Sequence, residues 1–283
     1  MRHGVIAGAM ICAAVNLFVQ PHAAMAQPLQ NSKIEVKYEE PTKSEHRVIY
    51  ERLKKREVLE QLKQFLSPLR LPKKLAIQTS ECGVVNAFYA KSKGLLLCYE
   101  YLNDLETRIA KDQTPPGFTR EPGYTPADAL VGGFLSVTFH EVGHALFDLL
   151  DVPVYGREED ASDQIAGFVV QQFGPQLARR MISGAAYMWL SKNRKLERTA
   201  FADEHGNDLQ RHYNFLCLGY GGQPGTFKEF VDKGALPAER ARNCTREYQQ
   251  VRNAFAKTIL PFVDQSMMKQ VQAAQWLRTE DFR

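Results

Sequence analysis

Two histidines and a glutamate in the segment from Leu135 to Leu146 have the types and the spacing of a metal site. His140, Glu141 and His144 form an H-E-x-x-H motif. Residues four apart lie on one face of a helix, so the two imidazoles can bind one tetrahedral ion at about 2.0 to 2.1 Å, while the glutamate between them reaches a metal-bound water. The spacing predicts a zinc site with hydrolytic chemistry.

A chance match is the alternative, because short motifs recur by coincidence. The flanking residues argue against it, since they are apolar nearly all round a helix, which indicates burial. They are Ala129, Leu130, Val131, Phe134, Leu135, Val137 and Phe139 before the motif and Val142, Ala145, Leu146, Leu149 and Leu150 after it. Each buried polar group without a partner would cost about 1 to 3 kcal/mol. The polar side chains of the motif must therefore contact a metal ion or hydrogen-bond partners.

The ends of this helix are also marked in the sequence. Thr125 can cap its first turn, Pro126 suits the first helical position, and Asp128 can reach back to the cap. Pro153 stops the pattern a few residues after Leu150. We expect a helix from Pro126 to Leu150.

A hydrolytic zinc site needs a third protein ligand and keeps its fourth position for water or substrate. The metzincin pattern is excluded, because Phe147 and Leu150 stand where it requires glycine and histidine. Fifteen residues after His144, Glu159 lies in an acidic stretch that opens a second helix. Glu159 is the predicted metal ligand, and Glu158 and Asp160 remain alternatives because element boundaries read from sequence shift by a few residues.

Asp163 lies four residues after Glu159, so both can face the first helix. We expect Asp163 to accept a hydrogen bond from the distal nitrogen of a ligand histidine. Acids in a first helical turn also complement the helix dipole. That reading accounts for Glu158 and Asp160, but it leaves the pair at Glu159 and Asp163 unexplained.

The H-E-x-x-H and E-x-x-x-D motifs together resemble the gluzincins, in which a glutamate is the third zinc ligand. More closely, the chain after its leader resembles a bacterial metallopeptidase family of unknown function. The landmarks of that resemblance are Cys82-Gly83, Asn86-Ala-Phe-Tyr89, Leu97-Cys-Tyr-Glu100, Gly156-Arg-Glu-Glu-Asp160 and Asp203-Glu-His205.

The resemblance implies a zincin-like architecture and a place for the substrate. Asn86-Ala87-Phe88, followed by a strand from Leu95 to Tyr99, resembles the edge strand above the zinc of membrane-associated gluzincins. A peptide would add to such an edge as an antiparallel strand. Glu141 would then act as general base on the zinc-bound water and pass the proton to the leaving amine.

The oxyanion of such a reaction needs a further donor, and the stretch from Phe201 to Tyr213 supplies candidates on a predicted third helix. His205 and His212 are seven apart there, which places them on one helical face, and Tyr213 follows. A lone histidine on a helix is more often solvated or part of the core. We therefore assign none of these three to the site.

The elements around the motifs predict an α+β protein with two lobes. The first, about residues 46–112, has an amphipathic helix through Leu59, Leu62 and Leu66 and a short antiparallel sheet with strands at Leu75 to Thr79 and Leu95 to Tyr99. The second, about residues 125–283, is mainly helical. We expect one zincin-like domain over residues 46–283, with the active site between the lobes, and a polar lead-in segment over residues 27–45.

The first 26 residues have the pattern of a signal peptide. Arg2 precedes an apolar run that is shorter than a membrane-spanning helix, and Ala24-Met-Ala26 is a small-residue cleavage site. We expect an exported chain, periplasmic or extracellular, with no membrane span after cleavage; an uncleaved anchor is the alternative.

Export changes the interpretation of the cysteines. Cys12 leaves with the leader, and the remaining four are Cys82, Cys98, Cys217 and Cys244. An even number in an exported chain favours two disulfides. Three pairings are possible, and local pairing is favoured because Cys82 and Cys98 flank a predicted hairpin.

The charge pattern says less about partners. The formal net charge is +4, spread over mixed clusters, and no module that interleaves basic and aromatic residues is evident, so we expect no nucleic-acid partner. The expected partner is a peptide or protein substrate. Two alternatives stay open: a catalytically silent binding protein with the same fold, and a zinc amidase acting on a non-peptide or cell-wall amide. The sequence does not determine the oligomeric state.

Overall fold

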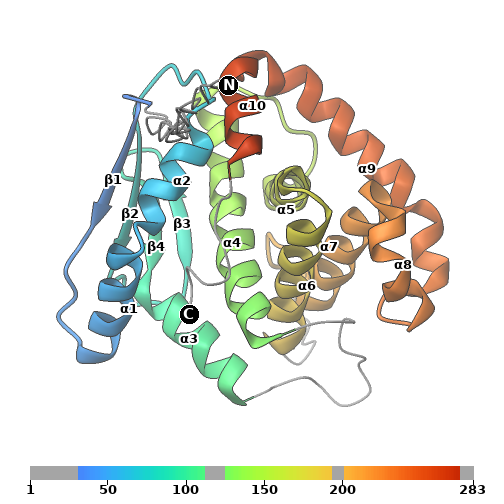
Figure 1. Cartoon of the computed structure of the whole chain (residues 1–283), viewed down its shortest axis with the longest axis horizontal. Coiled ribbons are helices and arrows are strands. Elements are labelled where there is room, and N and C mark those ends of the chain that lie inside the picture. Colours follow the sequence, from blue (N-terminus) through green and yellow to red (C-terminus); the bar gives the residue numbers. More distant parts are fainter. Residues whose placement is uncertain (1–30, 112–124, 193–200, 275–283) are drawn as a thin grey trace, which may run out of the picture.

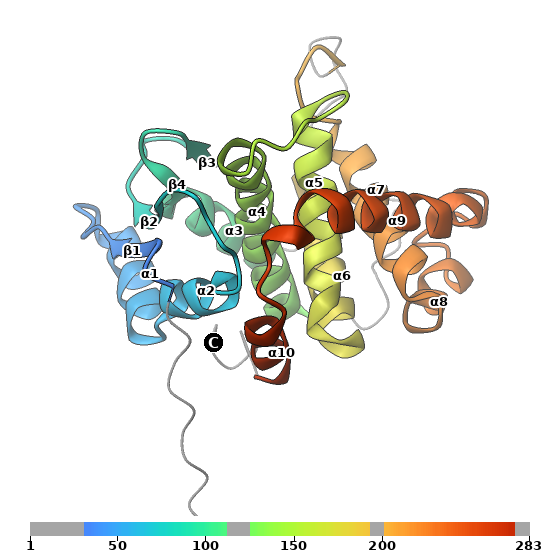
Figure 2. The same cartoon turned by 90° about the horizontal axis from the view of Figure 1, so that it is seen from above.

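The computed structural model describes residues 31–111, 125–192 and 201–274 of the chain (Figure 1). The expected signal peptide, residues 1–26, lies outside them. A small sheet lies on one side of a long central helix, α4, and the C-terminal helices pack on its other side (Figure 2). The α+β class that the sequence predicts is confirmed.

The first lobe contains β1 (Ile34–Tyr38), α1 (Ser44–Lys55), α2 (Val58–Leu66), β2 (Leu75–Ser80), β3 (Ala87–Ala90), β4 (Gly94–Cys98) and α3 (Tyr99–Lys111). The helical lobe contains α4 (Pro126–Leu149), α5 (Glu158–Val169), η1 (Val170–Phe173), α6 (Pro175–Lys192), α7 (Asp208–Gly222), α8 (Pro224–Asp232), α9 (Ala238–Thr258), η3 (Leu260–Phe262) and α10 (Gln265–Ala273).

The sheet is mixed, which corrects the expected antiparallel sheet. Its strand order is β1-β2-β4-β3, with β1 parallel to β2 and β2 parallel to β4. Only β3 and β4 pair antiparallel, with Ala87 opposite Leu97. The hairpin is visible in the sequence because its strands are neighbours, whereas parallel strands need a longer connection that leaves no local signal. As a result β3 lies at one edge of the sheet.

The segment predicted as a polar lead-in, residues 27–45, contains β1 and the beginning of α1. Ile34, Val36 and Tyr38 alternate with polar residues, as in a half-buried strand. Ile34 is fully buried and lies opposite Leu75 of β2. Five residues carry a weak signal when their pairing partner is distant in the sequence, and the folded first lobe therefore begins earlier than predicted.

Helix α4 has the start and the burial that its sequence predicts. The Thr125 hydroxyl accepts a hydrogen bond from the Asp128 backbone N–H and donates to the Asp128 carboxylate at 2.6 Å. Among the described helices, α4 is long and apolar enough to cross a membrane, but 89% of its apolar window is buried inside the protein. It is the helix against which both lobes pack.

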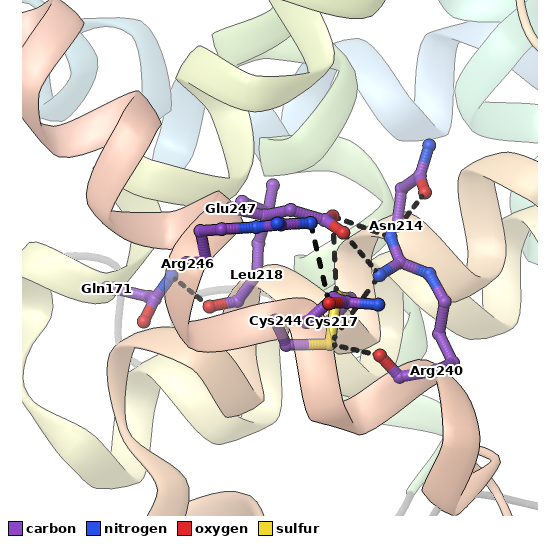
Figure 3. Close-up of a disulfide and its surroundings, with 9 residues drawn as sticks. Gln171, Asn214, Cys217, Leu218, Arg240, Cys244, Arg246 and Glu247 are labelled. Atoms are coloured by element: carbon purple, nitrogen blue, oxygen red, sulfur yellow. Dashed lines mark hydrogen bonds and ion pairs between the residues drawn. A yellow bond between two sulfur atoms is a disulfide. The ribbon is translucent and has the colours of Figure 1, made fainter.

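The described residues contain two disulfides, in the local pairing that the sequence favours. Cys82 is joined to Cys98 at the end of β4, and Cys217 of α7 is joined to Cys244 of α9. Beside the second disulfide, the Arg240 guanidinium donates to both oxygens of Glu247 at 2.7 Å (Figure 3). The first disulfide ties the segment that leads into β3 to the centre of the sheet.

Helices α4 and α6 approach closely at two glycines. A Cβ added to Gly184 of α6 would lie 2.0 Å from the Asp128 carbonyl oxygen and 2.8 Å from the Gly132 Cα of α4. Neither contact can be relieved by rotating a side chain, because both are with backbone atoms.

We therefore predict that Gly184→Ala lowers the free energy of unfolding by about 1 to 3 kcal/mol, because the helices must move apart. Gly225→Ala in α8 is the control. A Cβ at Gly225 meets nothing within 4 Å. The free energy of unfolding of Gly225→Ala should therefore be unchanged or higher by up to about 1 kcal/mol. Urea unfolding followed by circular dichroism measures both, and equal stabilities would contradict the close contact.

Candidate metal centre

The candidate site forms where α5 crosses α4. Gly143 lies between the two histidines of the H-E-x-x-H motif, and a Cβ on it would lie 3.0 Å from the Ser162 Cα of α5. The absence of a side chain at Gly143 lets α5 lie directly against this turn of α4. That contact brings the acidic first turn of α5 onto His140 and His144.

Three side-chain atoms converge at this crossing. The Nε2 atoms of His140 and His144 are 3.2 Å apart, and the Glu159 Oε2 atom is 2.9 Å from the first and 3.3 Å from the second. Bonds of about 2.0 to 2.1 Å to one tetrahedral ion separate its ligand atoms by roughly 3.3 Å. The donor set and its spacing therefore fit a zinc ion.

The other carboxylates of the stretch have different partners. Glu158 lies 2.7 Å from the Nδ1 atom of His144, and Asp160 pairs with Arg157 at 2.6 Å. Of the three carboxylates that the sequence leaves open, Glu159 is the one that reaches both Nε2 atoms. The helix dipole alone does not account for Glu158, because its carboxylate also contacts the imidazole of His144.

Asp163 lies behind His140, as its spacing from Glu159 predicts. Its Oδ1 atom is 2.8 Å from the His140 Nδ1 atom, and both residues are buried. Its carboxylate also accepts two hydrogen bonds from Arg211 of α7, a partner for which the sequence carries no signal.

The ionisation of these groups follows from their contacts. Burial raises the pKa of Glu159, but hydrogen bonds from three imidazoles lower it far more, so that its pKa lies well below the ordinary value. Burial lowers the pKa of His140, while Asp163 and Glu159 raise it more strongly, to about 9. A metal ion bound at the His140 Nε2 atom would take the place of a proton there.

Glu141 points to the sheet rather than to α5. Its Oε2 atom accepts a hydrogen bond of 2.7 Å from the Tyr89 backbone N–H of β3, and burial raises its pKa. The Tyr89 hydroxyl donates to Asp148 at 2.7 Å, and Lys91 pairs with the same carboxylate. These contacts hold the edge strand against the motif helix.

His205 lies at the centre but not on the predicted helix. The stretch from Phe201 to Tyr213 is not one helix, because α7 begins at Asp208 after a capping box made by Asn207 and Gln210. The cap satisfies the first backbone N–H groups of α7 and leaves His205 in the preceding segment. The expected shared helical face of His205 and His212 is therefore wrong.

The His205 Nε2 atom lies 2.8 Å from Glu159 Oε2, and its ring stacks on His140 with centroids 5.8 Å apart. His140, Glu159 and His205 thus form a second group that can hold a metal. His212, by contrast, is buried and donates to the Ala186 carbonyl, so it belongs to the core. Tyr213 packs against the same core.

A cleft of about 910 Å³ opens onto the centre. It is lined by β3 with Asn86 before it, by the motif turns of α4, by the segment from Asp151 to Glu159, and by Glu204 and His205. The site lies between the sheet and the helical lobe, where the sequence predicts it.

In this centre an H-E-x-x-H helix is crossed by a helix with an acidic first turn, beside the edge strand of a small sheet. The chain belongs to the family described as "Putative metallopeptidase", whose model matches residues 38–259. The resemblance to a metallopeptidase family of unknown function is thereby confirmed. No curated protein and no solved structure was found to match.

Proposed function

We propose that this protein is an exported, zinc-dependent metallopeptidase that hydrolyses peptide bonds. His140, His144 and Glu159 hold one zinc ion, Glu141 is the general base, and Asp163 orients His140. The observation that carries the proposal is the convergence of both Nε2 atoms on one Glu159 oxygen. Two imidazoles and a carboxylate are ligands typical of catalytic zinc, which supplies Lewis-acid chemistry by lowering the pKa of water and polarising a carbonyl oxygen.

Glu141 has the surroundings of a general base. Burial raises its pKa, which makes it a better proton acceptor, and the Tyr89 N–H fixes one of its oxygens at 2.7 Å. The fixed carboxylate takes a proton from the attacking water and gives it to the leaving amine. We propose that the Glu141 side chain makes both proton transfers without changing its position.

We assign His205 to the substrate side of the centre rather than to the ligand set. Its side chain is 41% exposed, whereas those of His140 and His144 are 5% and 15% exposed. Asp203 lies 3.0 Å from the His205 Nδ1 atom and directs the ring toward Glu159. Because its Nε2 atom contacts Glu159 Oε2 at 2.8 Å, His205 would exchange that contact for one with the oxyanion of a tetrahedral intermediate, and the fourth position of the ion would stay open.

The edge strand favours a peptide over another amide. β3 pairs with β4 on one side and borders the cleft on the other, beside Glu141. An extended peptide adds to such an edge through its backbone, which a non-peptide amide cannot do along its length. We propose a peptide or protein substrate in this cleft.

The two disulfides support export to the periplasm or the medium, since such bridges persist in oxidising compartments. We propose that the leader is removed after Ala26. In the proposed mature chain the catalytic domain begins with β1, ahead of the boundary at residue 46 expected from the sequence.

The ligand set predicts the response of stability to zinc. Zinc at about 100 times its Kd should stabilise the protein by about 2.7 kcal/mol, which corresponds to a rise in Tm of about 5 °C at this chain length. His144→Ala and Glu159→Ala should abolish the rise, and His205→Ala should retain most of it. Differential scanning calorimetry with and without a chelator measures each. If the zinc-dependent rise in Tm is lost in His205→Ala but kept in His144→Ala, His205 rather than His144 is the metal ligand.

Glu141→Gln should lower kcat by roughly 10² to 10⁴-fold while zinc still binds, because only the proton acceptor is removed. The assay is digestion of a peptide library by the purified protein, followed by mass spectrometry and repeated with a chelator. Glu239→Gln, a change at a carboxylate on α9 whose side chain is 90% exposed and lies outside the cleft, is the control and should leave kcat unchanged. Cleavage that survives both Glu141→Gln and the chelator would refute a metallopeptidase. Zinc binding without cleavage of any peptide would favour a silent binding protein or an enzyme for another amide.

A further inference from the structure

A buried ion pair lies directly behind the proposed metal centre. The Arg211 Nε atom donates to Asp163 Oδ2 and an Arg211 terminal nitrogen donates to Asp163 Oδ1, both at 2.6 Å. The two side chains are 6% and 9% exposed. Two parallel hydrogen bonds fix the plane of a carboxylate as well as its distance.

The Arg211 guanidinium is held on its other side by an indole. Its Cζ atom lies 3.5 Å from the centre of the Trp189 ring, which is itself buried. Such stacking favours a cation and restricts its motion. Arg211 is therefore clamped between Trp189 of α6 and Asp163 of α5.

Asp163 transmits this clamp to His140. Its Oδ1 atom accepts from Arg211 and also lies 2.8 Å from His140 Nδ1. An ionised carboxylate only accepts, so this contact requires a hydrogen on Nδ1 and leaves Nε2 as the nitrogen for a metal. Successive contacts thus run from Trp189 of α6 through Arg211 of α7 and Asp163 of α5 to the His140 ring of α4.

We propose that Arg211 is a positioning residue of the metal centre, which sets the ring plane and the tautomer of His140 by immobilising Asp163 against Trp189. The proposal rests on the proposed zinc site. Its physical basis is that burying an ion pair carries a desolvation cost, so a pair that only filled space would stabilise the fold less than apolar residues of the same volume. The partner of His144 is different, because the Glu158 side chain is 53% exposed.

The test is a double-mutant cycle read out by zinc affinity, measured by competition with a chromophoric chelator. Arg211→Met should weaken zinc binding roughly 10- to 100-fold, as loss of an outer partner of a ligand histidine does. Asp163→Asn should weaken it comparably. Adding Arg211→Met to Asp163→Asn should change the affinity by less than about 3-fold, because Arg211 acts through Asp163.

A spectroscopic measurement separates positioning from loss of fold. The visible absorption bands of the protein loaded with Co²⁺ report the ligand geometry, and Arg211→Met should shift them. Arg211→Lys keeps the positive charge but cannot make two parallel hydrogen bonds to Asp163, so its zinc affinity should be intermediate. This variant serves as the test if Arg211→Met does not fold.

Arg179→Met is the matched control. Arg179 lies ten residues before Trp189 on α6, roughly 15 Å along the helix, and has the same architecture, with an ion pair to Glu229 at 2.7 Å and its guanidinium over the Phe230 ring. It should leave zinc affinity and the cobalt spectrum unchanged.

Unchanged affinity and spectrum in a folded Arg211 variant, or an equal loss in Arg179→Met, would overturn the inference and leave the zinc site standing. A wild-type protein that binds no zinc would overturn the zinc site itself, and the inference with it.

Discussion

Helices α4 and α5 meet at Gly143 and Ser162 with almost no space between their backbones, and this crossing brings three donor atoms within about one ligand spacing of each other. A side chain at Gly143 would press on Ser162, so that α5 would have to yield at this crossing. The chemistry proposed for the site thus depends on a packing contact made by a residue that has no functional group. The tight crossing also explains why the carboxylate comes from the first turn of the next helix rather than from a loop.

The crossing concentrates charge at the inner end of the cleft, where Glu141 and Asp163 are buried and Glu159 is half-buried. Glu141, Glu159 and Asp163 are carboxylates, and Arg211 compensates one of them directly. The imidazoles compensate the rest when they carry protons, as the raised pKa of His140 indicates. A zinc ion would provide the same compensation with two positive charges while leaving the imidazoles neutral. The same arrangement of groups is therefore stable in the protonated form and suited to a metal.

The sheet contributes an edge rather than a face. Glu100 accepts from the backbone N–H groups of Cys82 and Gly83, and the disulfide from Cys82 to Cys98 fixes the same segment. From this anchored segment the chain runs into β3, where Tyr89 contacts both Glu141 and Asp148 of α4. The proposed general base and the strand proposed to receive a peptide are consequently held together by direct contacts.

Many features of this protein follow from patterns among residues that are close together in the sequence. The spacing of His140 and His144, the start of α4 at Thr125, the pair at Glu159 and Asp163 and the pair of Cys82 and Cys98 are patterns within one helix or around one hairpin, where the geometry follows from the local chain. The parallel pairing of β1, β2 and β4, the place of His205 beside Glu159, and the clamp of Trp189 and Arg211 behind Asp163 join segments that are distant along the chain. No local period encodes them. Only the packing of whole helices and strands decides which distant side chains meet, because that choice depends on how all the buried surfaces fit together at once.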